Sequence, residues 1–373
     1  MKKKRHKHYN LIVSTLFLLI LFLLLSGCEQ QKPKEKLVQK KETLIKEMKT
    51  LKLPKEQFEK IVGWLDDETL LYTIHQNKES LIFKYHLITG KSDLIFKSEK
   101  PIKTVVISPD HSKILVQTSP LTYLAKIYIL DRSGKTLFAK EMESYDLAYD
   151  WNERNTQFLA ISVFFEDWTF KVFILNLNDS SISEYDFSDP FIKWFGKDTI
   201  LSQVWDKKDI RLKAPLVSYS LNNIDKQTTL LKNIYHFDTL YNFLFTITVD
   251  SDNNEQARYH FYDHSLKEVY SFHIPHLSQY NDWLIPNYDF SEKENRFLTF
   301  VPYESGSIDE YEQHYKLVSY RILNKKEDVL FEHLQNEPIT CSPNGEVCLY
   351  GFQYEKILDL KTKKIVPIVE YKK

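Results

Sequence analysis

Short apolar runs recur along the chain from about residue 60 to the C-terminus, and polar turn residues separate them. Most of the runs are rich in Val, Ile, Leu, Phe and Tyr, and no stretch among them has the 3.6-residue period of a helix. Short β-branched and aromatic runs between turn residues are typical of β-strands. The pattern therefore predicts an all-β body.

The runs repeat in a fixed order, with successive copies roughly 42 to 54 residues apart. The second run of each unit covers 70–74, 114–118, 158–162, 200–204, 243–247, 297–301 and 348–352. The third run covers 81–87, 126–131, 171–177, 216–221, 258–264, 316–322 and 355–360. A polar turn and a fourth run follow, most clearly at 93–97, 136–140, 268–272, 328–332 and 365–369. The repeating unit is thus four short antiparallel strands.

A turn of recurring chemistry precedes the second strand, and its clearest copies are Ser-Pro-Asp at 108–110 and Ser-Pro-Asn-Gly at 342–345. Proline presets φ in such a turn, and Asp, Asn or Gly suits the tight positions after it. A four-stranded sheet of this size cannot bury both faces alone, whereas sheets packed face to face in a ring cover one another. The repeat predicts a β-propeller of antiparallel four-stranded blades. Seven blades are counted, and six remain possible.

The first 27 residues have the organisation of an export signal. Lys2 to Lys7 carry five positive charges and no acid, and Leu11 to Leu25 are apolar apart from two hydroxyl residues. A basic start followed by a short apolar stretch and small residues describes a secretory signal peptide. A transmembrane helix needs about 20 apolar residues, so this stretch is short for a membrane span.

The sequence Leu25-Ser26-Gly27-Cys28 resembles the lipobox of bacterial lipoproteins. The resemblance implies cleavage before Cys28 and transfer of a diacylglyceryl group to its thiol. Two fatty acyl chains, such as palmitate, hold a protein stably on a membrane where one chain holds it only marginally. We therefore expect a lipoprotein anchored to the bacterial cell membrane on its extracytoplasmic face. The alternative is an uncleaved signal anchor whose cysteine is incidental.

Charge is distributed unevenly along the chain. The segment 28–60 is rich in Lys and Glu with a net charge of about +4, whereas 61–373 carries about −10, and the whole chain carries −1. The basic segment reads as a charged, partly helical tether, either a solvated spacer or a contact to anionic headgroups. An acidic body lacks the basic stripe of nucleic-acid binders, so no nucleic-acid partner is expected. The predicted organisation is signal peptide 1–27, lipidated cysteine and tether 28–60, and propeller 61–373.

The Ser-Pro-Asp and Ser-Pro-Asn-Gly turns, each followed by an apolar strand, resemble the repeat of TolB-type and WD-like propellers. A lipobox, a charged spacer and a propeller together are similar to the YqgU-like propeller lipoproteins of Gram-positive bacteria. The resemblance covers nearly the whole chain and implies six blades, against the seven counted. Its motifs are structural, so it transfers no catalytic residue.

Cys341 and Cys348 flank the turn at 342–347. If that turn closes a hairpin, the two cysteines face each other within disulfide range, and export to an oxidising compartment permits the bond. Two free buried thiols are the alternative. A metal pair is disfavoured because the spacing is wider than in zinc sites and no second pair matches it.

No catalytic signature of a serine hydrolase, zinc protease, P-loop or dinucleotide-binding fold occurs in the sequence. Binding residues concentrate on loops of rigid scaffolds, and propellers usually bind on the face of the strand 2–3 and 4–1 loops. Exposed aromatic residues commonly anchor interfaces. The candidate ligand-binding residues on these loops are Trp168, Trp205, Tyr303, Glu304 and Asp309. Calcium or a basic partner is conceivable for the two acids, with a solvated loop as the simpler interpretation.

The leading hypothesis is a binding or scaffolding module for a protein, a peptide or an envelope polymer, with no cofactor and no metal site. The alternative is a propeller enzyme, a metal-assisted hydrolase or lyase with its site in the central channel. The lining of the channel discriminates between the two. Three or more His, Asp or Glu within ligand distance of one point would favour the enzyme.

Overall fold

The computed structural model describes residues 44–206, 212–249, 255–279 and 282–372. The chain divides into two compact units, Met1–Glu47 and Met48–Lys373. Helix α3 (Leu44–Glu47) is the described part of the first unit. The predicted signal peptide, Cys28 and most of the tether lie outside the described residues. No helix within the described ranges is long and apolar enough to cross a membrane.

Within the described ranges of the second unit, seven four-stranded sheets follow one another along the chain, numbered 1 to 7 here. Sheet 1 consists of β2 (Phe58–Asp66), β3 (Thr69–Gln76), β4 (Glu79–His86) and β5 (Lys91–Ser98), and sheet 2 of β6 (Ile102–Ile107), β7 (Lys113–Leu121), β8 (Leu124–Asp131) and β9 (Thr136–Glu143). Sheet 3 consists of β10 (Asp146–Trp151), β11 (Phe158–Phe164), β12 (Phe170–Asn176) and β13 (Ser181–Tyr185), and sheet 4 of β14 (Lys193–Trp194), β15 (Thr199–Gln203), β16 (Ala214–Ser220) and β17 (Asn223–Ile234). Sheet 5 consists of β18 (His236–Leu240), β19 (Phe243–Val249), β20 (Gln256–Tyr262) and β21 (Glu268–Pro275), sheet 6 of β24 (Tyr288–Ser291), β25 (Arg296–Pro302), β27 (Tyr315–Arg321) and β28 (Lys326–Leu334), and sheet 7 of β29 (Ile339–Cys341), β30 (Val347–Tyr350), β31 (Lys356–Asp359) and β32 (Lys364–Pro367).

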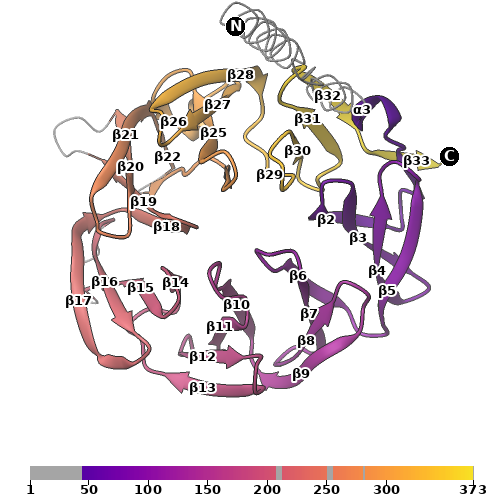
Figure 1. The fold of residues 1–373 in the computed structure, drawn as a ribbon, viewed down its shortest axis with the longest axis horizontal. Coiled ribbons are helices and arrows are strands. Elements are labelled where there is room, and N and C mark those ends of the chain that lie inside the picture. The colour runs from indigo at the N-terminus through magenta and orange to yellow at the C-terminus, as the bar shows by residue number, and fades with distance from the viewer. Residues whose placement is uncertain (1–43, 207–211, 250–254, 280–281, 373) are drawn as a thin grey trace, which may run out of the picture. The chain divides into compact units, whose positions relative to one another are not determined.

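The sheets stand side by side in a ring, with the first strand of each nearest the centre and the fourth at the rim (Figure 1). Every sheet is an antiparallel meander in sequence order, as sheet 3 shows with register pairs from Trp151↔Leu159 to Asn176↔Ser181. The prediction of a β-propeller built from four-stranded antiparallel blades is confirmed. Each strand predicted from the apolar runs falls on a strand of the structure.

The ring closes between sheet 7 and sheet 1. Strand β1 (Leu51–Pro54) pairs in parallel with β33 (Val369–Lys372), so the two ends of the second unit meet in a separate two-stranded sheet. The Trp64 indole of sheet 1 also donates to the Thr340 carbonyl of sheet 7, at 3.0 Å. The second unit therefore begins at Met48, earlier than the boundary at residue 61 expected from composition, because β1 and the start of β2 already belong to the propeller.

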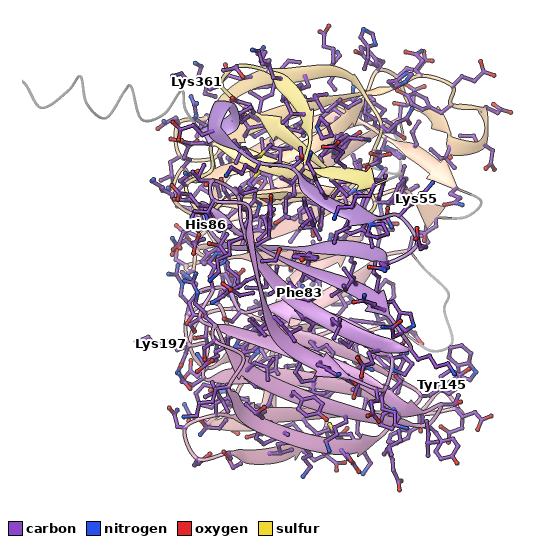
Figure 2. The ribbon with its side chains drawn as sticks, turned by 90° about the vertical axis from the view of Figure 1, so that its right-hand side faces the viewer. Lys55, Phe83, His86, Tyr145, Lys197 and Lys361 are labelled. Carbon is purple, nitrogen blue, oxygen red and sulfur yellow. A yellow bond between two sulfur atoms is a disulfide. The ribbon has the colours of Figure 1, made fainter. Side chains whose placement is uncertain are left out.

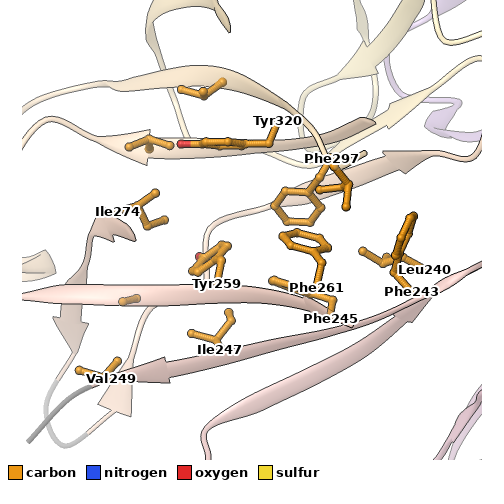
Figure 3. Close-up of a cluster of buried hydrophobic side chains, with 14 residues drawn as sticks. Leu240, Phe243, Phe245, Ile247, Val249, Tyr259, Phe261, Ile274, Phe297 and Tyr320 are labelled. Atoms are coloured by element: carbon orange, nitrogen blue, oxygen red, sulfur yellow. The ribbon is translucent and has the colours of Figure 1, made fainter. Parts of the chain in front are cut away.

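Apolar side chains fill the spaces between successive sheets. Figure 3 shows the cluster between sheets 5 and 6, where the rings of Phe245 and Phe297 lie 4.9 Å apart. Phe272 packs against this cluster and stacks on the Tyr320 ring at 3.6 Å. Similar clusters join each earlier pair of neighbours and the pair of sheets 6 and 7. Second strands are buried on both sides, as Phe158–Phe164 illustrates, which is why they read as continuous apolar runs.

Sheet 6 carries an additional small sheet on its connections. Strands β22 (Leu277–Gln279), β23 (Asp282–Trp283) and β26 (Gly306–Ser307) form it, and the 3₁₀ turn η1 (Ile308–Glu310) follows. This insertion accounts for the widest spacing in the sequence repeat, between 243–247 and 297–301.

The ring has two faces with different connections. Turns between strands 1 and 2 and between strands 3 and 4 lie on one face, and the loops between strands 2 and 3 and between consecutive sheets lie on the other. Figure 2 shows His86, Lys197 and Lys361 on the first face and Lys55 and Tyr145 on the second. We call them the turn face and the loop face.

Candidate binding cavity in the central channel

A cavity of about 780 Å³ lies at the centre of the ring, and the first strands of all seven sheets contribute to its wall. Turn residues such as Pro109, Glu153 and Pro343 also line it, so the cavity occupies the turn-face half of the channel. Its volume falls within the range of small-ligand pockets. The innermost strands thus bring together residues that are about 45 positions apart in the sequence.

Three neighbouring first strands place a charged row on the wall. The Lys193 ammonium of β14 lies 3.3 Å from an Asp150 oxygen on β10 and 2.9 Å from an Asp238 oxygen on β18. Burial raises the pKa of Asp150 to about 6, although Lys193 opposes the rise. Burial acts on Asp238 too, but Lys193 and the Tyr288 hydroxyl outweigh it and lower its pKa. The two carboxylates hold Lys193 protonated, with its pKa above the ordinary value despite burial.

The row continues onto β24 through hydrogen bonds. The Tyr288 hydroxyl donates to the second Asp238 oxygen at 2.7 Å, and the His236 Nε2 lies 3.3 Å from the same hydroxyl. Burial lowers the pKa of His236, so its ring is neutral near pH 7. Residues of four sheets therefore form one connected polar network on the channel wall.

Two other carboxylates of the cavity lack an ionic partner. Glu153 accepts a hydrogen bond from the Tyr241 backbone N–H at 2.6 Å, and Asp289 accepts one from the Cys341 N–H at 3.0 Å. Neither forms an ion pair within the part of the chain that the structure describes. Burial raises the pKa of Glu153 to about 8 and that of Asp289 to about 7. Each carboxyl group therefore holds a proton for part of the time at neutral pH.

Side chains reach across the ring at the turn face. Tyr241, with φ of 52°, follows β18, and its hydroxyl donates to the Pro109 carbonyl of sheet 2 at 3.3 Å. Arg154 of sheet 3 forms an ion pair of 3.5 Å with Glu292 of sheet 6. Positive φ is uncommon for a bulky residue and often marks a position held for function. These contacts bridge non-neighbouring sheets and partly cover the cavity.

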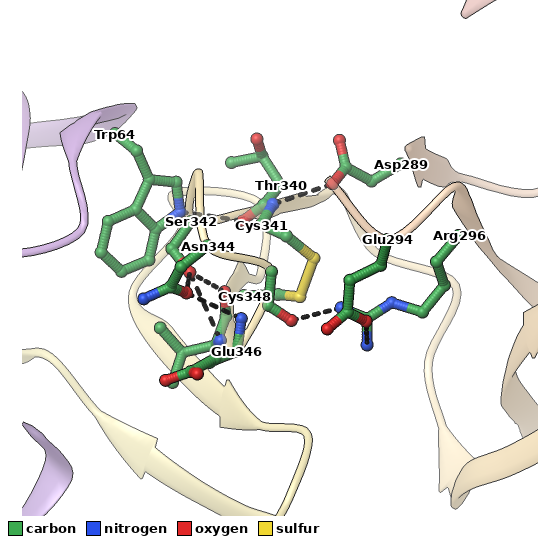
Figure 4. The surroundings of a disulfide bond; sticks show 12 residues. Trp64, Asp289, Glu294, Arg296, Thr340, Cys341, Ser342, Asn344, Glu346 and Cys348 are labelled. Atoms are coloured by element: carbon green, nitrogen blue, oxygen red, sulfur yellow. Dashed lines mark hydrogen bonds and ion pairs between the residues drawn. A yellow bond between two sulfur atoms is a disulfide. The ribbon is translucent and has the colours of Figure 1, made fainter. Parts of the chain in front are cut away.

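The Cys341–Cys348 disulfide stands beside the cavity (Figure 4). The two cysteines are directly opposite each other in the β29–β30 hairpin, and Cys341 also lines the cavity. Ser342 and Asn344 hold the turn between them through a hydroxyl–amide hydrogen bond of 2.8 Å. The hairpin expected from the turn sequence thus brings the sulfurs together, and their oxidation in the cell stays a prediction.

The five loop residues predicted to bind ligand lie on the loop face and not at the cavity. Trp168 is 92% exposed in the β11–β12 loop, and Trp205 is 41% exposed after β15. Tyr303 is half-buried under the Lys316 ammonium, 4.6 Å from its ring centre. Glu304 lines a separate cavity of about 450 Å³, and Asp309 belongs to η1. The structure therefore does not bring these residues together into one site, and their role stays a prediction.

The cavity residues were not identified from the sequence, although the sequence contains a signal for them. An aromatic residue followed by aspartate recurs in three first strands, at Tyr149-Asp150, Phe237-Asp238 and Tyr288-Asp289. A charged residue inside a strand of an otherwise apolar repeat marks the position whose side chain faces the central channel. In the described ranges, no group of three or more His, Cys, Asp or Glu is placed to hold a metal ion.

Comparisons with known proteins agree with this architecture. The model of the YqgU-like 6-bladed beta propeller domain matches residues 86–351. A curated relative from Bacillus subtilis, "Uncharacterized lipoprotein YqgU", is 27% identical over 361 residues, which cover 96% of this chain and 98% of the relative.

Two solved structures are similar in fold. The protein lmo1340 of Listeria monocytogenes has a TM-score of 0.81 at 25% identity, covering 87% of this chain and 98% of that one. The propeller domain of the Trilobed protease from Pyrococcus furiosus, which is described as having an open velcro topology, has a TM-score of 0.55 at 13% identity, covering 85% of this chain and all of that one. The similarity to the propeller domain of the Trilobed protease concerns the fold alone.

The family is described as six-bladed, whereas the described residues form seven four-stranded sheets. The matched segment starts at the last residue of β4 and ends just after β30, so it contains sheets 2 to 6 whole and parts of sheets 1 and 7. The match covers well over half of the sequence and accompanies a propeller in the structure. The chain belongs to the YqgU-like β-propeller domain family.

Proposed function

We propose that this chain is a membrane-anchored lipoprotein whose propeller acts outside the cytoplasm as a binding or scaffolding module for a protein, a peptide or an envelope polymer. The lipobox-like sequence ending at Cys28 and the lipoprotein name of the Bacillus subtilis relative support the anchor. Residues 29–47 separate Cys28 from the propeller unit.

One observation supports binding above the enzymatic alternative. The central cavity draws its wall from all seven sheets and contains buried carboxylates, yet no metal-ligand group occurs among the described residues. The metal-assisted hydrolase or lyase considered from the sequence therefore lacks a ligand set in this part of the chain. A preformed cavity with a few placed polar groups suits recognition of a ligand.

Site-specific photocrosslinking in intact cells tests the proposal. A photoreactive amino acid replaces Trp168 on the loop face or Lys293 on the turn face, and exposed Leu137 on β9 at the rim serves as the control. A binding module gives a defined crosslinked species from at least one face and none from the rim. Crosslinks of equal yield from all three positions, or none at any, would contradict a binding role for the faces of the ring.

A further inference from the structure

We propose that the central cavity binds an organic cation, namely a primary ammonium or guanidinium group, carried by a small molecule or by a side chain of a bound peptide. The proposal rests on the binding function above and names the chemistry of its ligand. It concerns the turn-face half of the channel, away from the aromatic loop residues.

The charge of the cavity wall is the first argument. Five carboxyl groups and two ammonium groups line it, and they are Asp150, Glu153, Asp238, Asp289, Glu292, Lys193 and Lys293. Lys193 is already shared by two aspartates, and Arg154 already pairs with Glu292. Five carboxyl groups against two ammonium groups leave the wall net negative, and among the described residues Glu153 and Asp289 accept hydrogen bonds from backbone N–H groups and form no ion pair with Lys293 or another cation. An anionic ligand would meet repulsion here.

Those two carboxylates are incompletely compensated, which is the second argument. A backbone N–H provides a partial charge, and a buried carboxylate without a cation is costly. Glu153 faces Tyr241, Asp150, Asp238 and Lys193, of which the two aspartates oppose its ionisation. Because burial raises the pKa of Glu153 and Asp289, protons balance part of this charge at neutral pH, and a bound cation would take their place.

Asp289 has a similar environment on the other side of the channel. It faces the Cys341 N–H of β29 and, at longer range, the Arg296 guanidinium of β25, which favours its ionised form without pairing with it. Arg296 is committed to an ion pair of 2.7 Å with Glu294. Asp289 therefore remains open to a further cationic partner.

Tyr241 also lines the cavity, and its backbone N–H donates to Glu153. Burial raises the pKa of its hydroxyl, and the negative charges of Glu153, Glu292 and Asp289 raise it further. A cation placed among them would also lie near the Tyr241 ring, and aromatic rings attract cations by about 0.5 to 2 kcal/mol. Hydrogen bonds from ammonium or guanidinium groups to carboxylates are among the stronger hydrogen bonds in proteins.

The side chains available as ligands and the volume of the cavity determine which kind of cation it can bind. A transition metal or calcium needs several oxygen, nitrogen or sulfur ligands around one point, and the described residues do not provide them. A cavity of about 780 Å³ is also large for a bare ion and accommodates an aliphatic amine or a long side chain.

Isothermal titration calorimetry on the full-length lipidated protein in detergent micelles tests the proposal. The probes are spermidine and an acetylated, amidated tetrapeptide with one internal lysine, with the norleucine tetrapeptide as the uncharged match. We expect one or both cationic probes to bind with release of protons and about tenfold or more tighter at pH 8.5 than at pH 6, because a proton competes at each carboxyl group below its pKa. Spermidine alone would indicate a small-molecule source, and the peptide alone a side-chain source.

Isosteric variants distinguish cation binding in the cavity from attraction of the cation to the charge of the protein surface. Glu153→Gln and Asp289→Asn keep an oxygen for the Tyr241 and Cys341 N–H groups, and each should weaken cation binding at least tenfold at pH 8.5. Glu141→Gln, which removes an exposed carboxylate on β9 paired with Lys126, should leave it unchanged. The far-ultraviolet circular dichroism of each variant verifies folding.

Three results would overturn the inference: no binding of either cationic probe at millimolar concentration, equal binding of the norleucine peptide, or equal loss in Glu141→Gln. If crosslinks from the faces persist in cells while neither cation binds, the cation site is wrong and the binding function stands. If cations bind but neither face gives crosslinks, the cation site stands and the proposed binding function of the two faces is wrong.

Discussion

Glu153 should make the propeller less stable as pH rises, and replacing it by glutamine should remove that dependence. Burial raises its pKa to about 8 from 4.5 for the free side chain. Below pH 4.5 the group is protonated in both the folded and the unfolded state. Between the two pKa values the unfolded chain has released the proton that the folded protein retains, so each rise in pH favours unfolding. Above pH 8 the penalty stays constant.

The size of the effect follows from the same two values. A pKa difference from 4.5 to about 8 corresponds, at about 1.36 kcal/mol per unit, to an upper bound of about 5 kcal/mol. For the unit Met48–Lys373, an unfolding entropy of about 2 cal/mol/K per residue converts 1 kcal/mol into roughly 1.5 °C of melting temperature. The Glu153→Gln variant should therefore melt up to about 7 °C above the unmodified protein at pH 9 and close to it at pH 4.5.

Thermal unfolding followed by tryptophan fluorescence from pH 4.5 to 9 measures this difference. Contributions of Asp150 and Asp289 occur in both proteins and largely cancel in the comparison. The control Glu141→Gln, which changes an exposed carboxylate, should give a melting difference that does not vary with pH. A difference for Glu153→Gln that is flat with pH, or that shrinks as pH rises, would refute the reasoning about this buried carboxyl group.

Three further changes have defined outcomes. Cys28→Ala should move the protein from the membrane pellet to the soluble fraction or block its processing, and an unchanged fractionation would contradict lipidation. Lys193→Met leaves Asp150 and Asp238 facing each other and should destabilise the fold by about 3 to 5 kcal/mol, measured by urea unfolding, whereas Lys171→Met, which removes an exposed ion pair with Glu184, should cost under 1 kcal/mol. Mass spectrometry without reduction should find no alkylatable thiol at Cys341 and Cys348, and reduction should lower stability by about 2.5 kcal/mol; two free thiols in protein isolated from cells would exclude the bond.

Burial explains which strands could be predicted from the sequence. Second and third strands lie inside each sheet and face neighbouring sheets on both sides, so strands such as β11 read as continuous apolar runs. Fourth strands lie at the rim, where β13 with the sequence Ser-Ile-Ser-Glu-Tyr is mostly exposed and shows little apolar pattern. The fourth strands of sheets 3 and 4 were accordingly not found, although the repeat implied them.

Exposed aromatic residues in the loops were easier to recognise than the cavity, because single loop residues stand out against polar neighbours. Trp168 does project into solvent, whereas Tyr303 packs beside Lys316 and His333. Nothing in a linear sequence says whether such residues converge, since each belongs to a loop of a different sheet. Trp64, Trp151 and Trp194, by contrast, recur at the first turn, and all three are buried.

The cavity escaped prediction because of the geometry of the ring itself. The first strand of sheet 4, β14, is just Lys193–Trp194, and the inward side chains of the first strands face the channel instead of an apolar neighbour. A strand that lines a water-accessible channel does not require the apolar run by which strands are recognised in a sequence. In a propeller, the residues that meet at the centre are therefore found where a polar or charged residue interrupts the apolar pattern of the repeat. Asp150, Lys193 and Asp238 fit this rule, since each is a charged residue of its own first strand and the ring brings Lys193 within ion-pair distance of both aspartates.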